Sequence, residues 1–319
     1  MIERTEILVT GATGFVGSAV MKALAGHDLI DCTGAVRSSR GITKCYGHQV
    51  IVGELNQSTD WTTALAGKHI VIHTAARAHV IKDVITDPLA EYRRVNVEGT
   101  LNLARQAATL GVKRFVFLSS IKVNGETTTD EQVFFADAEP TPEDFYGLSK
   151  LEAERGLMRL STETDMEVVI IRPPLVYGPG VKGNFASMIK LVDKRVPLPL
   201  GAIHNKRSLV GIDNLVDLII RCLDHPAAAN QVFLAGDGED LSTTELLRGV
   251  GQAMGNPARL IPVPAGLLQF GAMLLGKEAM AQRLLGSLQV DISKTCEVLG
   301  WKPPYTVEEG LKRCFERSN

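Results

Sequence analysis

The strongest constraint on the fold of this chain lies near its beginning, where a hydrophobic run leads through spaced glycines into an amphipathic segment. Residues 7–10 form the run, and Gly11, Gly14 and Gly17 follow it. Such glycines allow a tight turn, a close approach of backbone to pyrophosphate, and close packing of the next helix on the strand. The helix then offers free N–H groups to phosphate. The pattern predicts a dinucleotide site rather than a plain turn, formed by Gly11, Thr13, Gly14, Phe15, Val16 and Gly17.

Short apolar or β-branched runs alternate with amphipathic segments through the first half of the chain. We expect strands at 7–10, 32–36, 49–52, 69–73, 115–119 and 167–172, and helices at about 16–25, 95–110 and 146–161. This alternation predicts an α/β Rossmann fold, a doubly wound parallel sheet with helices on both faces.

The amino-acid composition changes after Arg172, where prolines and glycines become frequent. These segments predict loops that build a smaller, discontinuous substrate-binding lobe. Residues 208–212 and 232–235 read as two more strands, which we expect to return to the main sheet. The assignment is therefore residues 1–172 and 208–240 to an NAD(P)-binding Rossmann domain, and residues 173–207 and 241–319 to the substrate lobe.

Charge and composition exclude several classes of function. The net charge of -2 and the absence of a polybasic run argue against nucleic-acid binding. The most apolar late stretch, residues 265–276, is too short to span a bilayer, which takes about 20 residues, so we expect a buried or groove-lining helix and no membrane partner. The polar start, without an export signal, predicts a cytoplasmic protein. An odd set of widely spaced cysteines predicts reduced thiols and no metal site: Cys32, Cys45, Cys222, Cys296 and Cys314.

Arg37 stands at the end of the second expected strand, about 20 residues beyond the glycines. An acidic residue there would bind the adenosine ribose hydroxyl of NAD, whereas a basic one suits the 2'-phosphate of NADP. We therefore expect NADP(H), with NAD(H) as the alternative if Arg37 is only a solvated loop charge.

Tyr146 and Lys150 form a Y-x-x-x-K pattern at the start of an expected helix, so both side chains lie on one face. A free phenol has a pKa of about 10, and a neighbouring ammonium together with a nicotinamide cation would stabilise the phenolate. Ser120 directly follows the expected strand 115–119, at the sheet edge where ligands bind. It could hydrogen-bond the reacting oxygen, while Ser119 suits a capping role better.

Together these motifs resemble the extended short-chain dehydrogenase/reductases of the NAD-dependent epimerase/dehydratase family. The similarity covers nearly the whole chain, and the matching segments are 11–17, 73–76, 96–100, 119–120, 146–150 and 172–178. The resemblance implies that Ser120, Tyr146 and Lys150 are catalytic.

The resemblance also implies contacts for cofactor and substrate. Cofactor contacts would come from Arg37, Glu54, Leu55, Ala75, Ala76, Asn96, Tyr146, Lys150 and Pro173, with Asn96 supporting the catalytic helix. Substrate contacts would come from Ser120, Asn124, Asn184, Arg207 and Arg283. Asn124 replaces an aromatic residue of the family, and the spacing after Arg283 is shortened, which leaves the sugar open.

The favoured reaction by this resemblance is reduction of a UDP-4-keto-6-deoxy-N-acetylhexosamine by NADPH in O-antigen polysaccharide synthesis, and Arg37 agrees with NADPH. The alternative is a UDP-glucose or UDP-N-acetylglucosamine 4-epimerase that holds NAD. A dehydratase is disfavoured, because residues 121–122 are Ile-Lys where dehydratases carry acids. A non-enzymatic NADP(H) sensor is a remote alternative that the catalytic residues oppose. Relatives of this kind pair through a helical bundle, so we expect a homodimer.

Overall fold

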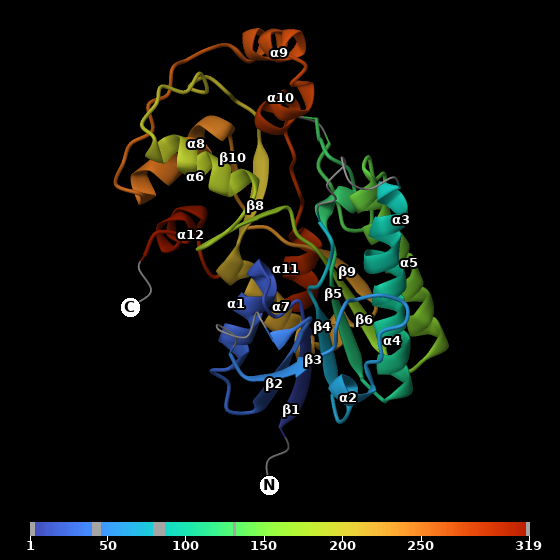
Figure 1. Ribbon diagram of the computed structural model, residues 1–319. Coiled ribbons are helices and arrows are strands. Elements are labelled where there is room, and N and C mark those ends of the chain that lie inside the picture. The colour runs from blue at the N-terminus through green and yellow to red at the C-terminus, as the bar shows by residue number, and fades with distance from the viewer. Residues whose placement is uncertain (1–3, 40–45, 79–86, 130–131, 317–319) are drawn as a thin grey trace.

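A seven-stranded parallel sheet forms the centre of the computed structural model, which describes residues 4–39, 46–78, 87–129 and 132–316 (Figure 1). Its strand order is β3-β2-β1-β4-β5-β6-β9, and every neighbouring pair is parallel. The bounds are β1 Thr5–Thr10, β2 Ile30–Val36, β3 His48–Ile51, β4 Ile70–His73, β5 Arg114–Leu118, β6 Glu167–Arg172 and β9 Gln231–Leu234. The predicted doubly wound Rossmann sheet is confirmed.

Helices cover both faces of this sheet because its strands are apolar on both sides. Leu8 and Phe115 point to the face covered by α2, α4 and α5. Val9 and Val116 point to the opposite face, under α1, α7 and α11. The helices are α1 Phe15–Leu24, α2 Thr62–Leu65, α3 Pro88–Tyr92, α4 Thr100–Thr109, α5 Phe145–Glu163, α7 Ile212–Asp224 and α11 Ser293–Leu299, with a π-helical turn Arg93–Gly99 before α4.

A second, three-stranded sheet lies beside the first and has the order β10-β8-β7. Its strands are β7 Leu175–Tyr177, β8 Arg207–Gly211 and β10 Asp240–Leu241. The expectation that residues 208–212 return to the main sheet is wrong, whereas that for residues 232–235 is confirmed by β9. The physical reason is the Pro173–Pro174 pair, which ends β6 and directs the chain into β7, the strand that β8 then joins.

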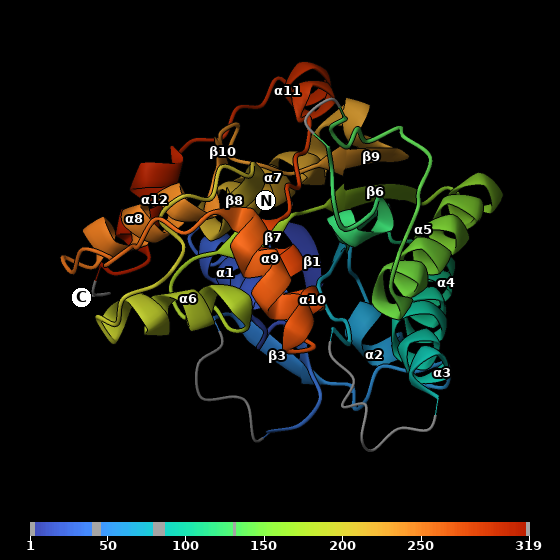
Figure 2. The same ribbon diagram turned by 90° about the horizontal axis from the view of Figure 1, so that it is seen from above.

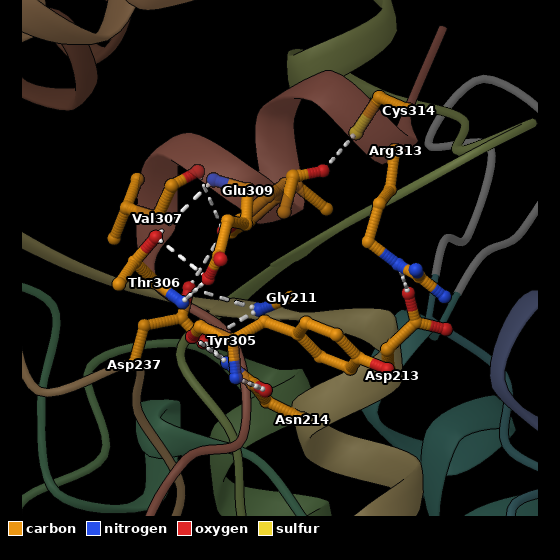
Figure 3. Close-up of polar contacts among 12 residues, drawn as sticks. Gly211, Asp213, Asn214, Asp237, Tyr305, Thr306, Val307, Glu309, Arg313 and Cys314 are labelled. Carbon is orange, nitrogen blue, oxygen red and sulfur yellow. Dashed lines mark hydrogen bonds and ion pairs between the residues drawn. The ribbon is translucent and has the colours of Figure 1, made fainter. Parts of the chain in front are cut away.

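The smaller sheet packs against α6 Asn184–Asp193, α8 Thr243–Ala253 and α12 Val307–Arg313 around a separate core. A buried polar junction connects this region to the main sheet (Figure 3). Asp237, just after β9, accepts hydrogen bonds from the Gly211 amide at 2.9 Å and from Asn214 Nδ2 at 2.7 Å. The Tyr177 hydroxyl donates to the same carboxylate at 2.7 Å, and Asn214 also pairs with the backbone of Tyr305. The division of the chain into two lobes stays a prediction.

Two helices, α9 Ala265–Leu274 and α10 Glu278–Leu285, lie at the tip of the molecule in Figure 1. None of the residues of α9 is buried, so of the two expected alternatives the buried helix is wrong, and the groove-lining helix stays a prediction. Only Ala265 and Leu268 pack against the core, because the other large side chains of α9 face outward. Within the described ranges, no helix is long and apolar enough to cross a membrane. Four cysteines are free thiols there, and Cys45 lies outside the described residues.

Candidate active site

A cavity of about 490 Å³ opens at the carboxyl ends of β1, β2 and β4 and beside the segment that follows β3. Most of the expected cofactor residues line it, namely Gly11, Thr13, Gly14, Arg37, Glu54, Leu55, Ala75 and Ala76. Its size is typical of a cofactor site, and the glycine loop at its base fits a dinucleotide. Sequence reasoning missed Thr74, Arg77, Arg94 and Trp61, which also line the cavity. Thr74 and Arg77 flank the alanine pair and could have been found from it, whereas no motif in the sequence around Trp61 indicates that this residue lines the cavity.

The glycine loop is tightly packed against the end of β4. Gly11 has φ +67, and its carbonyl accepts a hydrogen bond from the Gly14 amide at 2.8 Å. A Cβ at Gly17 would lie 2.2 Å from the Gly11 carbonyl oxygen, which explains the third glycine. Gly14 precedes α1 and has no side chain that could cap it, so the first amides of the helix face the cavity side of the loop uncapped. Phe15, Val16 and Gly17 stand in α1 and do not line the cavity.

Two groups of opposite charge, Arg37 and Glu54, line the cavity next to β2 and β3. Arg37 follows β2 directly and its exposed side chain lines the cavity. Glu54 belongs to a turn that Thr59 fixes, because the Thr59 hydroxyl donates to the Glu54 carbonyl at 2.6 Å. Leu55 packs against the π-helical turn, where a Cβ at Gly99 would lie 2.8 Å from Leu55 Cγ. A cation and a carboxylate thus flank the end of the cavity next to β2 and β3.

Lys150 is the most tightly held of the expected catalytic side chains, with 1% of its surface exposed. Its Nζ donates to the carbonyl of Leu118 at 2.6 Å and lies 3.9 Å from the centre of the Phe117 ring. Burial lowers the pKa of Lys150 to about 7. The amino group is therefore fixed at the end of β5, in surroundings that disfavour its charged form.

Asn96 supports the helix that carries these groups. Its Nδ2 donates to the Ser149 hydroxyl at 3.0 Å, and its Oδ1 accepts from the Arg77 amide at 2.8 Å. Asp144 caps the same helix by accepting from the Gly147 amide at 2.6 Å. These contacts agree with the supporting role expected for Asn96 and hold the first turn of α5 in place.

Tyr146 lies half-buried in this first turn. Burial raises the pKa of its phenol to about 12, and the charge of Asp144 and the neighbouring Tyr92 act in the same direction. Lys150 is not among the groups that shift the pKa of Tyr146 in the chain alone, so the expected stabilisation of the phenolate by Lys150 and a nicotinamide cation stays a prediction.

Ser120 follows β5 and precedes a short 3-10 helix, Ile121–Val123. Its Oγ accepts a hydrogen bond from the Lys122 amide at 3.3 Å, which leaves the hydroxyl proton free to donate. The Ile121 amide binds the carbonyl of Pro173 at 3.0 Å, so the serine loop is tied to the end of β6. The expectation that Ser119 caps this turn is wrong, because Ser120 does so. Ser119 Oγ is buried without a hydrogen-bond partner among the described residues.

Asn124, which was expected to contact the substrate, is buried and bonded within the protein. It is 1% exposed, its Oδ1 accepts from Arg172 at 3.0 Å, and its Nδ2 donates to the carbonyl of Phe135 at 3.0 Å. Arg172 forms a bidentate pair with Glu154, with contacts of 2.6 and 3.0 Å. A buried cation requires such partners, which is why the amide points inward rather than toward a sugar.

The other three expected substrate residues, which the resemblance places at the diphosphate of a sugar nucleotide, belong to the smaller sheet region and the segment after it. Arg207 in β8 donates to the carbonyls of Arg283 at 3.1 Å and Gly286 at 3.0 Å, so the structure brings Arg207 and Arg283 together. Burial lowers the pKa of Arg207 below its usual range. Asn184 is the exposed first residue of α6. In the part of the chain that the structure describes, no cluster of His, Cys, Asp and Glu could hold a metal ion.

The comparisons with known proteins agree with this geometry. Residues 7–236 match the model of the NAD dependent epimerase/dehydratase family. A UDP-glucose 4-epimerase from Vibrio cholerae is 52% identical over 309 residues, which cover 97% of this chain and 94% of that protein.

Two solved structures share the fold. The UDP-glucose 4-epimerase of Thermotoga maritima with UDP-glucose superimposes with a TM-score of 0.75 at 23% identity, covering 97% of both chains. The UDP-glucuronic acid 4-epimerase of Bacillus cereus in complex with NAD gives a TM-score of 0.76 at 22% identity, covering 97% of this chain and 95% of that one. The chain is therefore an enzyme of the extended short-chain dehydrogenase/reductases and belongs to the NAD dependent epimerase/dehydratase family.

Proposed function

We propose that this enzyme is an NAD-dependent 4-epimerase of UDP-linked hexoses. The observation that carries the proposal is the 52% identity, over nearly the full length, to a protein named UDP-glucose 4-epimerase. This reverses the order of preference that the sequence alone favoured, in which a net reductase came first. Ser120, Tyr146 and Lys150, at the end of β5 and the start of α5, support the chemistry.

Tyr146 is the proton carrier in this proposal. Bound NAD supplies a reversible acceptor for the hydride that leaves C4 of the sugar. Tyr146 takes the proton of the C4 hydroxyl during oxidation and returns it when the keto sugar is reduced from its opposite face. Burial raises the pKa of Tyr146, and the positive charge of a bound nicotinamide would act in the opposite direction and favour proton removal.

Ser120 and Lys150 position the reacting oxygen and the tyrosine. The hydroxyl of Ser120 accepts from the Lys122 amide, so its own proton can be donated to the sugar oxygen. The Leu118 carbonyl and the Phe117 ring hold the Lys150 amino group at the end of β5, where it would bind the ribose of the cofactor beside Tyr146. Arg207, Arg283 and Asn184 would hold the diphosphate of the sugar nucleotide.

A net reductase remains a second candidate because of Arg37. An exposed guanidinium that lines the cavity next to β2 suits the 2'-phosphate of NADPH better than the ribose hydroxyl of NAD. A reductase consumes its cofactor with each turnover, whereas an epimerase regenerates NAD within each cycle. The two candidates therefore differ in what the purified protein retains and in whether NADPH is oxidised.

The test combines cofactor identification with two assays. The purified protein is denatured and the released dinucleotide identified. UDP-glucose and UDP-N-acetylglucosamine are then followed for conversion at C4, and NADPH oxidation is followed with UDP-4-keto-6-deoxy-N-acetylglucosamine. We expect retained NAD, conversion of a UDP-sugar without net oxidation, loss of activity in Tyr146→Phe, and full activity in Tyr46→Phe, whose exposed side chain is a matched control. Stoichiometric NADPH oxidation without interconversion would establish the reductase instead.

A further inference from the structure

The tip of the molecule carries a group of large apolar side chains exposed to solvent, which we call the apical face. Six of them, each between 53% and 71% exposed, come from α9 and α10 and the link between them: Leu267, Phe270, Met273, Leu274, Leu275 and Met280. Isolated apolar residues on a protein surface are ordinary, but a contiguous group of this size marks an interaction site.

The chain does not cover this face itself. Among the described residues of α9, only Ala265 and Leu268 pack against the core of the smaller sheet region. Its closest neighbour is α10, whose Met280 is itself 56% exposed. A helix that is apolar on its outer side and unburied within its own chain requires an external partner.

The charges around the apical face indicate the chemistry of that partner. The segment 261–276 contains no charged residue, and the link to α10 and α10 itself carry the exposed cations Lys277 and Arg283 against one exposed carboxylate, Glu278. The whole chain has a net charge of -2, so this end is cationic within an otherwise anionic protein. Apolar side chains with a cationic rim match the boundary between acyl chains and anionic headgroups.

The position of the face suits a flat surface. In Figure 1 α9 forms the outermost point of the molecule, at the end opposite the N-terminus, and Figure 2 shows α9 and α10 foremost when the molecule is seen from that end. A planar partner can therefore contact α9 without meeting the main sheet. A ten-residue helix is about 15 Å long, half of the roughly 30 Å of a hydrocarbon core, so it can lie in the interface but cannot cross it.

We propose that the apical face docks this enzyme on the surface of a bilayer that contains anionic lipids. A second copy of the chain fits the face less well, because its own apical face carries the same excess of cations, so a two-fold contact would bring together two surfaces of like charge. The docking does not depend on the proposed chemistry. It does place the proposed diphosphate site at the membrane, because Arg207 binds the backbone of Arg283 directly behind α10.

The test is flotation of the full-length protein with phosphatidylglycerol-rich vesicles and with pure phosphatidylcholine vesicles. We expect binding to the anionic vesicles, weaker binding to the neutral ones, and loss of the difference at high salt. Phe270→Ser combined with Leu274→Ser should lower the partition coefficient at least about tenfold, since two large apolar side chains no longer enter the interface. Lys277→Glu should weaken binding to anionic vesicles only.

The matched control is Leu29→Ser combined with Leu110→Ser, two apolar side chains of 55% and 42% exposure outside the apical face. This control should float like the wild type. In Phe270→Trp, emission should shift to the blue on adding anionic vesicles, because the two native tryptophans are already buried. Thermal melting shows that each variant is folded. Failure of the wild type to bind anionic vesicles would overturn the proposal, as would a dimer in ultracentrifugation that Phe270→Ser with Leu274→Ser dissociates.

Discussion

Replacing Glu154 by leucine tests the buried ion pair that joins the catalytic helix to the end of β6. Glu154 and Arg172 are 3% and 4% exposed, and the guanidinium also binds the Asn124 amide oxygen. Removing the carboxylate leaves the buried arginine without its charged partner, which costs about 3–5 kcal/mol. Because a domain is stable by only about 5–15 kcal/mol, the loss should be obvious. In Glu154→Leu combined with Arg172→Met, most of the stability should return, since neither charge is then buried.

The measurement is urea unfolding followed by the fluorescence of the buried Trp61 and Trp301. For Glu154→Leu we expect a lower urea concentration at the unfolding midpoint, with an unchanged slope of the unfolding free energy against urea concentration. The matched control is Glu152→Leu, two residues earlier on α5, where the carboxylate pairs with Arg93 in the same bidentate way but both side chains are partly exposed. That pair should contribute about 0–1 kcal/mol. A cost for Glu154→Leu no greater than for Glu152→Leu, or no recovery in the double variant, would refute the reasoning.

Three further predictions concern the cofactor side of the molecule. Gly17→Ala would place a Cβ 2.2 Å from the Gly11 carbonyl oxygen, so we expect a loss of about 1–3 kcal/mol in thermal unfolding and weaker dinucleotide binding. Burial lowers the pKa of His73 from 6.5 to about 3. Between these two pH values the unfolded chain binds more protons than the folded one, so the free energy of unfolding falls as the pH is lowered from 6.5 to about 3. In urea unfolding, His73→Gln should reduce that slope by up to about 1.4 kcal/mol per pH unit, and an unchanged slope would contradict the assignment. Arg37→Asp should shift the ratio of NADP to NAD affinity toward NAD, measured by fluorescence titration, while an unchanged ratio would show that Arg37 does not meet the adenosine ribose.

The parallel sheet and the glycine loop could be predicted because their signals are local. Apolar runs of strand length and glycines at fixed spacing occupy single stretches of sequence, and parallel pairing then brings their carboxyl ends together. The partner of β8 could not be predicted in this way. Its apolar pattern is the same whether it joins the main sheet or β7, and the choice depends on where Pro173 and Pro174 direct the chain.

The candidate site was predictable to a similar extent. The alanine pair 75–76 and Arg37 line the cavity as expected, since they directly follow strands. Trp61 reaches the cavity through tertiary packing, which no local pattern reports. The orientation of Asn124 depends on Arg172, a buried cation from a distant part of the sequence that binds the Asn124 amide oxygen. The exposure of α9 could not be predicted either, because an apolar run indicates that a helix is covered but does not show whether the covering surface belongs to the same chain.

The way α7 covers the main sheet has a consequence for biosynthesis. Six of the seven strands come from the first 172 residues, but the face that carries Val9 and Val116 is closed by Leu215, Leu218 and other side chains of α7, which follows only after residues 173–211. A nascent chain or a proteolytic fragment that ends after β6 therefore carries an open apolar face and should aggregate or occupy a chaperone. The sheet becomes stable late in synthesis, when the ribosome has released α7 and β9.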